Sequence, residues 1–348
     1  MSISREQILA IDLGNGTTSY MAGNGKEGSF ASLVAQADKR TVGNESFGKD
    51  VFTTKNGQCY VIGDQVREEG AANRSTDSSY YSSEHIRVLF LKVLSLAGIK
   101  NPVIVTGLPT EFCSSHKKEF AENLTKWARE EGYHPEGIKI LEQFVGPWLD
   151  DQLQDVDGNN IDPKLILTGR IGVMDIGQGT IDCGLFNQGK LSDKRYGESK
   201  GVSDIHKSVF TSLQDIDRLN ASMPKGAQKL PKEFKLDVLT TVYTIDTWMR
   251  DEHFMWRGQR FDFEPISRPA RQQFASDTLP RAITNVWGNT DFLNAMVCAG
   301  GGVSVLGLSI LKEYITCPIL MARDPSMSIV RGFFRYGTKQ MTKTKAEV

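Results

Sequence analysis

The sequence has few cysteines, no long apolar run and no basic tract, and each absence excludes a class of protein. The five cysteines are scattered, with no Cys-x-x-Cys pair and no histidine cluster, which argues against a disulfide framework and against structural zinc. No apolar stretch reaches the roughly 20 residues of a membrane span. Acidic and basic residues nearly cancel to a formal net charge of -1, so we expect neither direct DNA binding nor a membrane partner.

The remaining composition is that of an ordinary globular protein. Its 348 residues suffice for one large or two medium domains. The polar start leads directly into a strand-like run, so we expect no signal peptide and a reduced, cytoplasmic protein. Cys183 and Cys298 lie in apolar runs and are expected to be small buried side chains.

One stretch of the chain occurs twice in similar form. An apolar run ends at Asp175, a turn of Gly177, Gln178, Gly179 and Thr180 follows, and a second apolar run begins. Near the N-terminus an apolar run likewise ends at Asp12 and is followed by a turn with the sequence Gly-Asn-Gly-Thr. Both read as β-hairpins, and two such units far apart predict two related lobes that face each other.

Strand and helix patterns alternate through the rest of the chain, which predicts an α/β fold with a partly parallel sheet covered by helices. The helix over 271–287 is expected to be interrupted near Pro280. Helices are predicted over 84–97, 114–131, 143–153, 201–215, 238–249, 271–287, 303–314 and 326–341. Strands are predicted over 8–13, 17–21, 30–35, 59–62, 102–108, 138–141, 169–175, 181–186, 191–196 and 295–299.

Residues 154–164 resemble part of a calcium-binding loop. Their glycine falls at the wrong place and Ile166 stands at the closing position, where such a loop needs glutamate. This favours a surface turn over a metal site.

The glycine turns have a definite chemistry. A glycine turn after a buried strand exposes backbone N–H groups that can cradle phosphate oxygens, and an aspartate at the strand end can hold Mg²⁺ through water. A third apolar run ends in Gly300, Gly301 and Gly302 and precedes a helical pattern, where a base or ribose could pack onto backbone. Each motif alone also fits an ordinary turn or cap, but three motifs in this order predict a nucleotide site.

These three motifs resemble the first phosphate, second phosphate and adenosine motifs of the actin, sugar-kinase and heat-shock-chaperone superfamily. Within it, the ParM/StbA-type plasmid-partition proteins are the most similar group. The resemblance implies a two-lobed α/β fold, each lobe a mixed five-stranded-type sheet flanked by helices, with nucleotide in the cleft between. The expected domains are 1–165 plus 326–348, and 166–325.

The resemblance also implies site roles. Asp12 and Asp175 would organise Mg²⁺, with Asp175 also counted as catalytic, and Glu142 would orient or deprotonate the attacking water. For Glu142 the alternative is a carboxylate at a helix N-terminus, favoured by the dipole. The predicted contacts to ATP or GTP are Asp12, Gly14, Asn15, Gly16, Thr17, Gly177, Gln178, Gly179, Thr180, Gly300, Gly301 and Gly302.

Two positions depart from the pattern of the relatives. Many of them carry a lysine seven residues after the first aspartate, where this chain has Ser19. Many also have a third glycine where this chain has Gln178. The first change leaves less positive charge near the phosphates, and the second alters how the turn contacts the nucleotide.

The function implied is an ATPase that forms nucleotide-dependent polar filaments and segregates plasmid or other DNA through a DNA-binding adaptor protein. One alternative is a small-molecule phosphotransferase, or kinase, of the same fold. Another is a non-filamentous, nucleotide-switched binding module.

Overall fold

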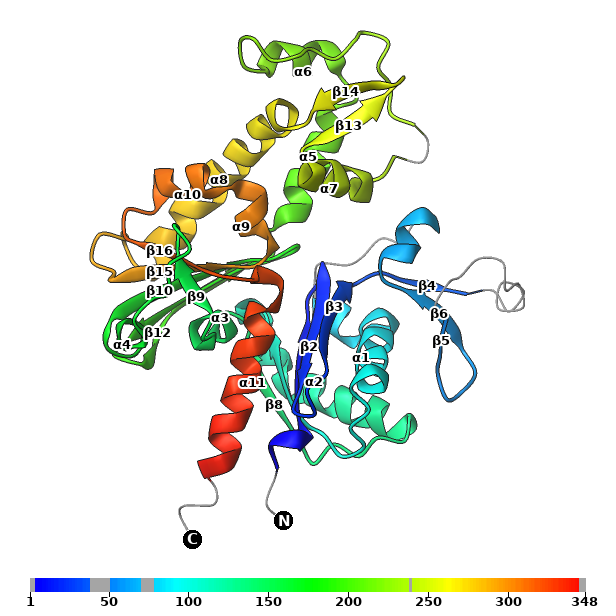
Figure 1. Ribbon diagram of the computed structural model, residues 1–348, viewed down its shortest axis with the longest axis vertical. Helices are drawn as coiled ribbons and strands as arrows, with labels where there is room; N and C mark the ends of the chain where they lie inside the picture. The colour runs from blue at the N-terminus through cyan, green and yellow to red at the C-terminus, as the bar shows by residue number, and fades with distance from the viewer. Residues whose placement is uncertain (1–3, 38–50, 70–77, 238–239, 344–348) are drawn as a thin grey trace.

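The computed structural model describes residues 4–37, 51–69, 78–237 and 240–343. It contains two large sheets, each covered by helices on both faces, and a smaller set of elements above the second sheet (Figure 1). The predicted α/β class with two sheet-containing lobes is therefore confirmed.

The first sheet has five strands in the order β3-β2-β1-β7-β8. Strand β1 pairs antiparallel with β2 and parallel with β7. Alternate residues of β1 face opposite layers: Leu9 and Ile11 pack with α1 and α2, whereas Ile8 and Ala10 pack with α11. The bounds are β1 Ile8–Leu13, β2 Thr17–Ala22, β3 Glu27–Ala31, β7 Val103–Leu108, β8 Gly137–Glu142, α1 Glu84–Ala97, α2 Thr110–Glu130 and α11 Pro325–Lys343.

The second sheet has six strands in the order β12-β11-β10-β15-β16-β9. One face packs on α5, α8, α9 and α10, and the other on α3. The bounds are α3 Val145–Leu149, β9 Leu153–Asp155, α4 Pro163–Thr168, β10 Arg170–Ile176, β11 Ile181–Asn187, β12 Lys190–Glu198, α5 Val202–Ser212, α8 Glu264–Val286, β15 Ala295–Ala299, α9 Gly301–Leu306, α10 Leu308–Tyr314 and β16 Ile319–Ala322.

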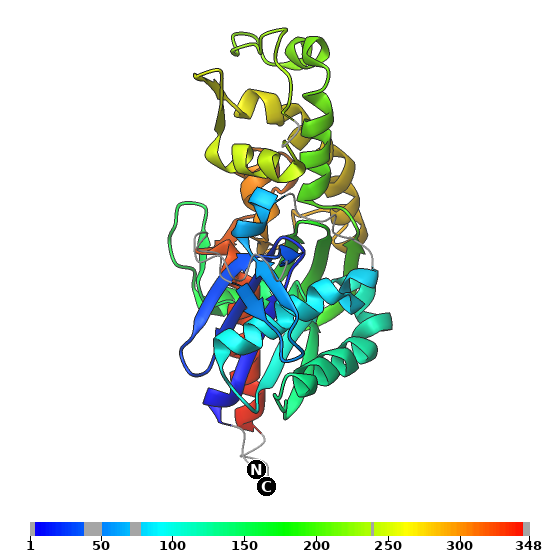
Figure 2. The ribbon, with the colours of Figure 1, turned by 90° about the vertical axis from the view of Figure 1, so that its right-hand side faces the viewer.

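Two smaller groups of elements complete the described chain. A three-stranded sheet lies beside the first lobe, and a hairpin with two helices lies above the second (Figures 1 and 2). The bounds are η1 Arg5–Gln7, β4 Val34–Gln36, β5 Val51–Thr53, β6 Cys59–Ile62, η3 Asp64–Glu69, η4 Ser78–Ser82, α6 Ile216–Ser222, α7 Val242–Asp251, β13 His253–Trp256 and β14 Gln259–Asp262.

Most predicted elements occur within a few residues of their expected bounds, and helix α1 occurs as predicted. Its start is capped by the Ser83 hydroxyl, which accepts a hydrogen bond from the Ile86 N–H. Its end is formed by Gly98 in the left-handed conformation, with φ of 71°. Cys183 and Cys298 are buried, as expected.

Helix α8 differs from its prediction. It begins earlier, at Glu264, and continues through both Pro269 and Pro280. The prediction of a break near Pro280 was wrong, because packing of the helix on the second sheet outweighs the lost backbone hydrogen bond.

Other boundaries were also wrong. The helix predicted over 143–153 is only the short α3, and the chain then enters strand β9. The helix predicted over 303–314 is divided at Gly307, whose φ is +80°. The strands β5, β9, β13, β14 and β16 were not predicted, because each is short and stabilised by a distant or hairpin partner rather than by its own pattern.

The surface turn predicted over 154–164 occurs but is shorter, because the range begins in strand β9 and ends in helix α4. The Asp155 carboxylate accepts hydrogen bonds from the N–H groups of Asp157 and Asn159. The first residues of the helix predicted over 238–249 lie outside the described residues. No helix in the described ranges is both long enough and apolar enough to span a bilayer.

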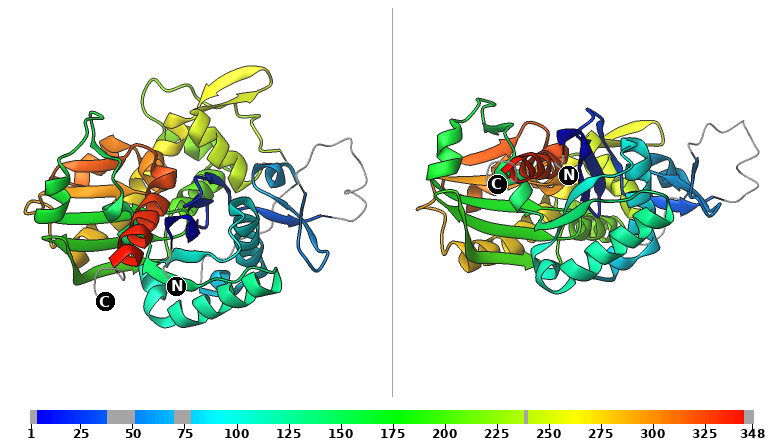
Figure 3. Two further views of the ribbon diagram at one scale, coloured as in Figure 1. Left: turned by 60° about the horizontal axis from the view of Figure 1, so that its bottom comes forward. Right: turned by 90° about the horizontal axis from the view of Figure 1, so that it is seen from below.

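Helix α11 lies between the two lobes (Figure 3) and packs against helix α3. Gly332 and Gly146 lie in direct backbone contact where these helices cross. Beside the crossing, the buried Arg331 guanidinium donates two hydrogen bonds of 2.9 and 2.7 Å to the Asp150 carboxylate. The α11 side of the crossing packs on β1 of the first sheet, and the α3 side packs on the second sheet.

Candidate functional site

The two glycine turns predicted from the sequence face each other. A Cβ built on Gly16 would lie 3.0 Å from the Cβ of Gln178. Gly16 follows β1 in the first sheet and Gln178 follows β10 in the second. The structure therefore brings together two turns that lie far apart in the sequence.

The first turn is held by polar groups from outside the hairpin. The Ser32 hydroxyl donates to the Gly14 carbonyl oxygen at 2.6 Å and pairs with the Thr18 hydroxyl at 2.8 Å. The Tyr80 hydroxyl donates to the same Gly14 oxygen at 3.5 Å. Thr17 is exposed, and Gly14, Asn15 and Gly16 are half-buried, so this turn is accessible at its tip.

The second turn is joined to the start of helix α5. The N–H groups of Val202 and Ser203 donate to the carbonyl oxygens of Gly177 and Gln178, at 3.1 and 2.9 Å. Gly179 is buried, and the Thr180 hydroxyl donates to the Asp182 carboxylate at 2.8 Å.

The third glycine motif lies against the second. Strands β10 and β15 are parallel neighbours with Asp175 opposite Ala299. Gly300 has φ of +82°, and a Cβ there would collide with the Asp175 carboxylate. Gly302 likewise leaves no room for a Cβ beside Ile176, whereas Gly301 is open. A side chain at Gly300 would therefore displace the second aspartate.

Three carboxylates are buried among these turns: Asp12, Asp175 and Asp182. Burial raises the pKa of Asp12 to about 7, although a hydrogen bond from Gln143 opposes the rise. Burial, and then the charges of Asp182 and Asp12, raise the pKa of Asp175 well above its ordinary value. Asp12 and Asp175 thus influence each other across the two lobes.

Asp175 is the least satisfied of the three. One of its carboxylate oxygens is buried and has no hydrogen-bond partner within the described residues. A buried, unpaired carboxylate oxygen is costly, and a cation beside it would remove that cost. No group of three or more His, Cys, Asp or Glu side chains in the described part of the chain could hold a metal by itself. Mg²⁺ commonly takes one or two carboxylates and completes its shell with phosphate and water, so Asp12 and Asp175 fit that role.

Glu142 lies in a different environment from the one that its predicted role suggests. Both of its carboxylate oxygens accept from the Arg195 guanidinium at 2.9 Å. The next residue, Gln143, is buried and donates its amide to Asp12 at 3.0 Å. In this structure the residue directed at the first aspartate is therefore Gln143, and the role of Glu142 stays a prediction.

Two site residues were not singled out from the sequence. Gln143 directly follows strand β8, and the sequence pattern does not show where its side chain would point. Asp182 stands seven residues after Asp175, as Ser19 stands seven after Asp12; both pairs are directly opposite in their hairpins. That shared spacing could have identified Asp182.

Asp182 and Ser19 each join the hairpins to other elements. The Asp182 carboxylate accepts from the Thr110 N–H of the first lobe at 2.5 Å, and burial raises its pKa to about 6. Ser19 is buried and donates to the Ser326 carbonyl oxygen at the start of α11, at 2.8 Å.

Comparisons with known proteins agree with this fold. Residues 10–133 match the model of the family described as Actin like proteins N terminal domain, whereas no curated protein matches the sequence. A pCBH ParM non-polymerisable quadruple mutant has a TM-score of 0.69 and 20% identity, covering 95% of this chain and 99% of its own.

Two further solved structures are similar. A subunit of a 15-stranded ParM filament from Clostridium botulinum has a TM-score of 0.67 and 19% identity, covering 95% of this chain and 99% of its own. An archaeal actin homologue in complex with ADP has a TM-score of 0.59 and 16% identity, covering 96% and 99%. These likenesses establish the fold.

Proposed function

Starting from a chain with the actin-like fold, whose N-terminal part matches the model of that family's domain, we propose that it is a cytoplasmic nucleotide hydrolase that assembles into polar filaments. In this proposal the filaments segregate plasmid or other DNA through a DNA-binding adaptor. The observation that carries the proposal is the meeting of Asp12, Asp175 and two glycine turns from opposite lobes.

The nucleotide would lie between the facing turns. Gly14, Asn15, Gly16 and Thr17 from one lobe, and Gly177, Gln178, Gly179 and Thr180 from the other, would line its phosphates, while Gly300 to Gly302 would face adenosine. Support comes from the accessible tip of the first turn and from the ADP complex of one structural relative. We propose ATP, with GTP as the other candidate.

Asp12 and Asp175 would hold Mg²⁺, which when bound offsets phosphate charge during phosphoryl transfer. Burial raises the pKa of both carboxyl groups, so the protein alone disfavours two negative charges here. Binding of a cation would therefore keep both carboxylates ionised and hold the two lobes in one orientation.

The attacking water would be oriented by a residue at the end of β8. Gln143 is favoured by its hydrogen bond to Asp12, because that bond fixes the amide beside the phosphate turn. Glu142 could act there only after leaving Arg195. Asp182 would position the second turn through Thr180 and the Thr110 backbone.

Nucleotide-dependent assembly is the direct test. We expect light scattering to rise, and electron micrographs to show filaments, when the full chain is mixed with Mg²⁺ and ATP or a non-hydrolysed analogue. Phosphate should be released to water and not transferred to a small molecule. Absence of assembly with ATP, GTP and the analogue at all protein concentrations would overturn the filament proposal, while measured phosphate release would decide the hydrolase proposal separately.

The variant Asp175→Ala tests the proposed metal site. We expect it to lose Mg²⁺-dependent nucleotide binding by at least about tenfold, because it removes a metal ligand. Circular dichroism would verify that the variant is folded, and unchanged Mg²⁺-dependent affinity would remove Asp175 from the site.

A further inference from the structure

The described residues expose four large apolar side chains, and these fall on two faces of the second lobe. Leu167, Leu191 and Phe292 are 56%, 39% and 76% exposed, and Met255 is 59% exposed. An exposed large apolar group is informative when it belongs to a group of such residues rather than standing alone.

The first three gather at one end of the second sheet, which we call the sheet-end patch. Leu167 lies in α4 just before β10, Leu191 begins β12, and Phe292 precedes β15. Strands β10 and β15 are parallel and start together, with Ile171 opposite Ala295. The β11–β12 turn joins them there, since Asn187 is opposite Arg170 and Gly189 lies against Leu167.

Phe292 is exposed on a loop that hydrogen bonds tie to the residue Thr316, which follows α10. Asp291 accepts from the Thr316 hydroxyl at 2.5 Å, and the Thr290 hydroxyl accepts from the Thr316 N–H at 2.9 Å. The next residue, Leu293, is buried. The aromatic ring is therefore held outward by a fixed backbone, which lowers the entropy lost when it binds a partner.

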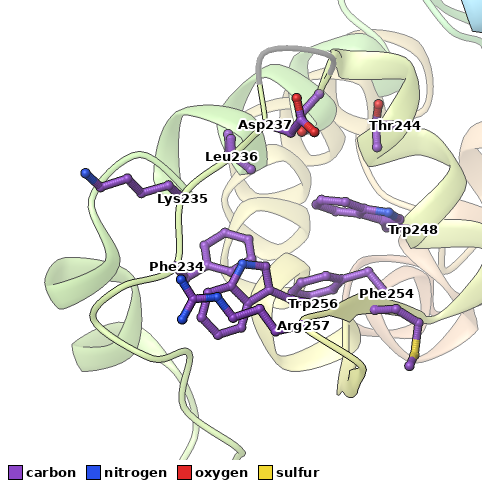
Figure 4. Close-up of a pocket in the computed structure, with 11 residues that line it drawn as sticks. Phe234, Lys235, Leu236, Asp237, Thr244, Trp248, Phe254, Trp256 and Arg257 are labelled. Atoms are coloured by element: carbon purple, nitrogen blue, oxygen red, sulfur yellow. The ribbon is translucent and has the colours of Figure 1, made fainter.

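Met255 lies on the wall of an aromatic pocket at the opposite end of the lobe. The pocket has a volume of about 430 Å³. Figure 4 shows its aromatic side chains close to one another, with Lys235 extending away from them and Arg257 lying over the Trp256 ring. Its aromatic lining comprises Phe234, Trp248, Phe254 and Trp256.

Helix α8 separates the two faces. It begins two residues after the β13–β14 hairpin that forms the pocket and ends shortly before the loop that carries Phe292. With 23 residues, its length is roughly 35 Å. Figure 1 shows the hairpin and the β10, β12 and α4 ends at opposite sides of the lobe. The two faces of one copy therefore cannot reach each other.

We infer that the sheet-end patch of one copy docks into the aromatic pocket of the next copy, with Phe292 entering the pocket. The charges agree with this occupant, because Asp291 stands beside Phe292, whereas the pocket lining carries two basic residues, Lys235 and Arg257, and one acidic residue, Asp237. Two different faces at opposite ends of one molecule form a head-to-tail contact, which repeats without closing. The inference rests on the proposed filament and identifies a contact that builds it.

Three variants of the full chain test the contact. Phe292→Asp removes the inserted ring, Met255→Glu places a carboxylate on the pocket wall against Asp291, and Lys118→Glu makes a similar charge change on exposed α2 as the control. Each altered residue is exposed, so folding should be retained. We expect the first two to raise the critical concentration for assembly by about tenfold or more, and the control to assemble as the natural chain does.

A mixture of the Phe292→Asp and Met255→Glu variants tests the contact more directly. A Phe292→Asp copy keeps its pocket and a Met255→Glu copy keeps its patch, so an equal mixture should form heterodimers, whereas each variant alone should stay monomeric in sedimentation velocity. Normal assembly by both variants, a mixture that stays monomeric, or equal loss in Lys118→Glu would overturn the inferred contact. If the natural chain itself never assembles, the filament proposal fails with it; if only the variants behave unexpectedly, this contact alone fails.

Discussion

Buried carboxylates determine the chemistry of this molecule at the scale of single residues. Asp12, Asp175 and Asp182 are each nearly inaccessible, and burial is the largest cause of the raised pKa in all three. A side chain that prefers to be neutral in the folded protein responds both to pH and to a bound cation. Two predictions concern Asp12: one its own titration, the other the side chains at the end of β8.

The first concerns pH. A carboxyl with a raised pKa binds protons more tightly in the folded chain than in the unfolded one, so it stabilises the fold at low pH and this contribution is lost as pH rises. For Asp12 the loss spans pH about 4 to about 7. Without nucleotide or metal, we expect stability to fall from pH 5 to pH 7.5 on this account, by on the order of 1–4 kcal/mol.

Urea unfolding of the natural chain and of Asp12→Asn at both pH values would measure this loss. The variant, which has no titrating group at this position, should show a smaller fall. An equal fall in both proteins would show that Asp12 is not the group responsible.

The second prediction compares neighbouring side chains. Gln143→Ala should slow phosphate release by about a hundredfold, because it removes the amide held by Asp12. Glu142→Ala should slow it less, because its carboxylate is engaged by Arg195. Steady-state phosphate release and nucleotide affinity, measured for both, separate turnover from binding. A larger loss in Glu142→Ala would restore the sequence-based assignment and require the ion pair to open when nucleotide binds.

At the scale of elements, the crossing of α3 and α11 brings two helices that pack on different sheets into close backbone contact. A Cβ on Gly332 would overlap the Gly146 carbonyl group, and the Arg331–Asp150 ion pair lies beside this contact. Because packed interiors tolerate little added volume, the crossing depends on glycine at both positions.

Gly332→Ala should therefore destabilise the fold by about 1–3 kcal/mol, although alanine by itself favours a helix. Gly137→Ala is the matched control, since a Cβ there would meet nothing within 4 Å. Thermal or urea unfolding of both variants checks this. A Gly332→Ala protein as stable as the control would show that the helices separate easily at this point.

At the scale of the whole molecule, the meeting of the two turns defines how the lobes are arranged. The Gly16–Gln178 contact and the hydrogen bond from Thr110 to Asp182 join the lobes at this meeting. Gln178 also contacts His206 of α5 at 3.4 Å, so its side chain touches both lobes.

A Gly16→Cys, Gln178→Cys double variant should form a disulfide under mild oxidation, because the two Cβ positions are close to bonding range. We expect the bond to block nucleotide exchange, which should return after reduction. The single variants, which contain the same native cysteines, are the controls. Failure to form the bond in the absence of nucleotide would show that the lobes are farther apart in solution.

The sequence by itself determined the repeated strand–turn–strand units, most helices and the glycine motifs, because these depend on local periodicity and on residues with special backbone freedom. The predicted domain division stays a prediction; strand β9, which falls within the first predicted domain, pairs in the second sheet. The short strands, the continuous helix α8 and the directions of Glu142 and Gln143 were decided only by tertiary structure. Each depends on a partner distant in the chain: β16 for β9, the second sheet for α8, and Arg195 and Asp12 for the two side chains. Local pattern cannot encode which distant groups will meet, whereas packing determines it.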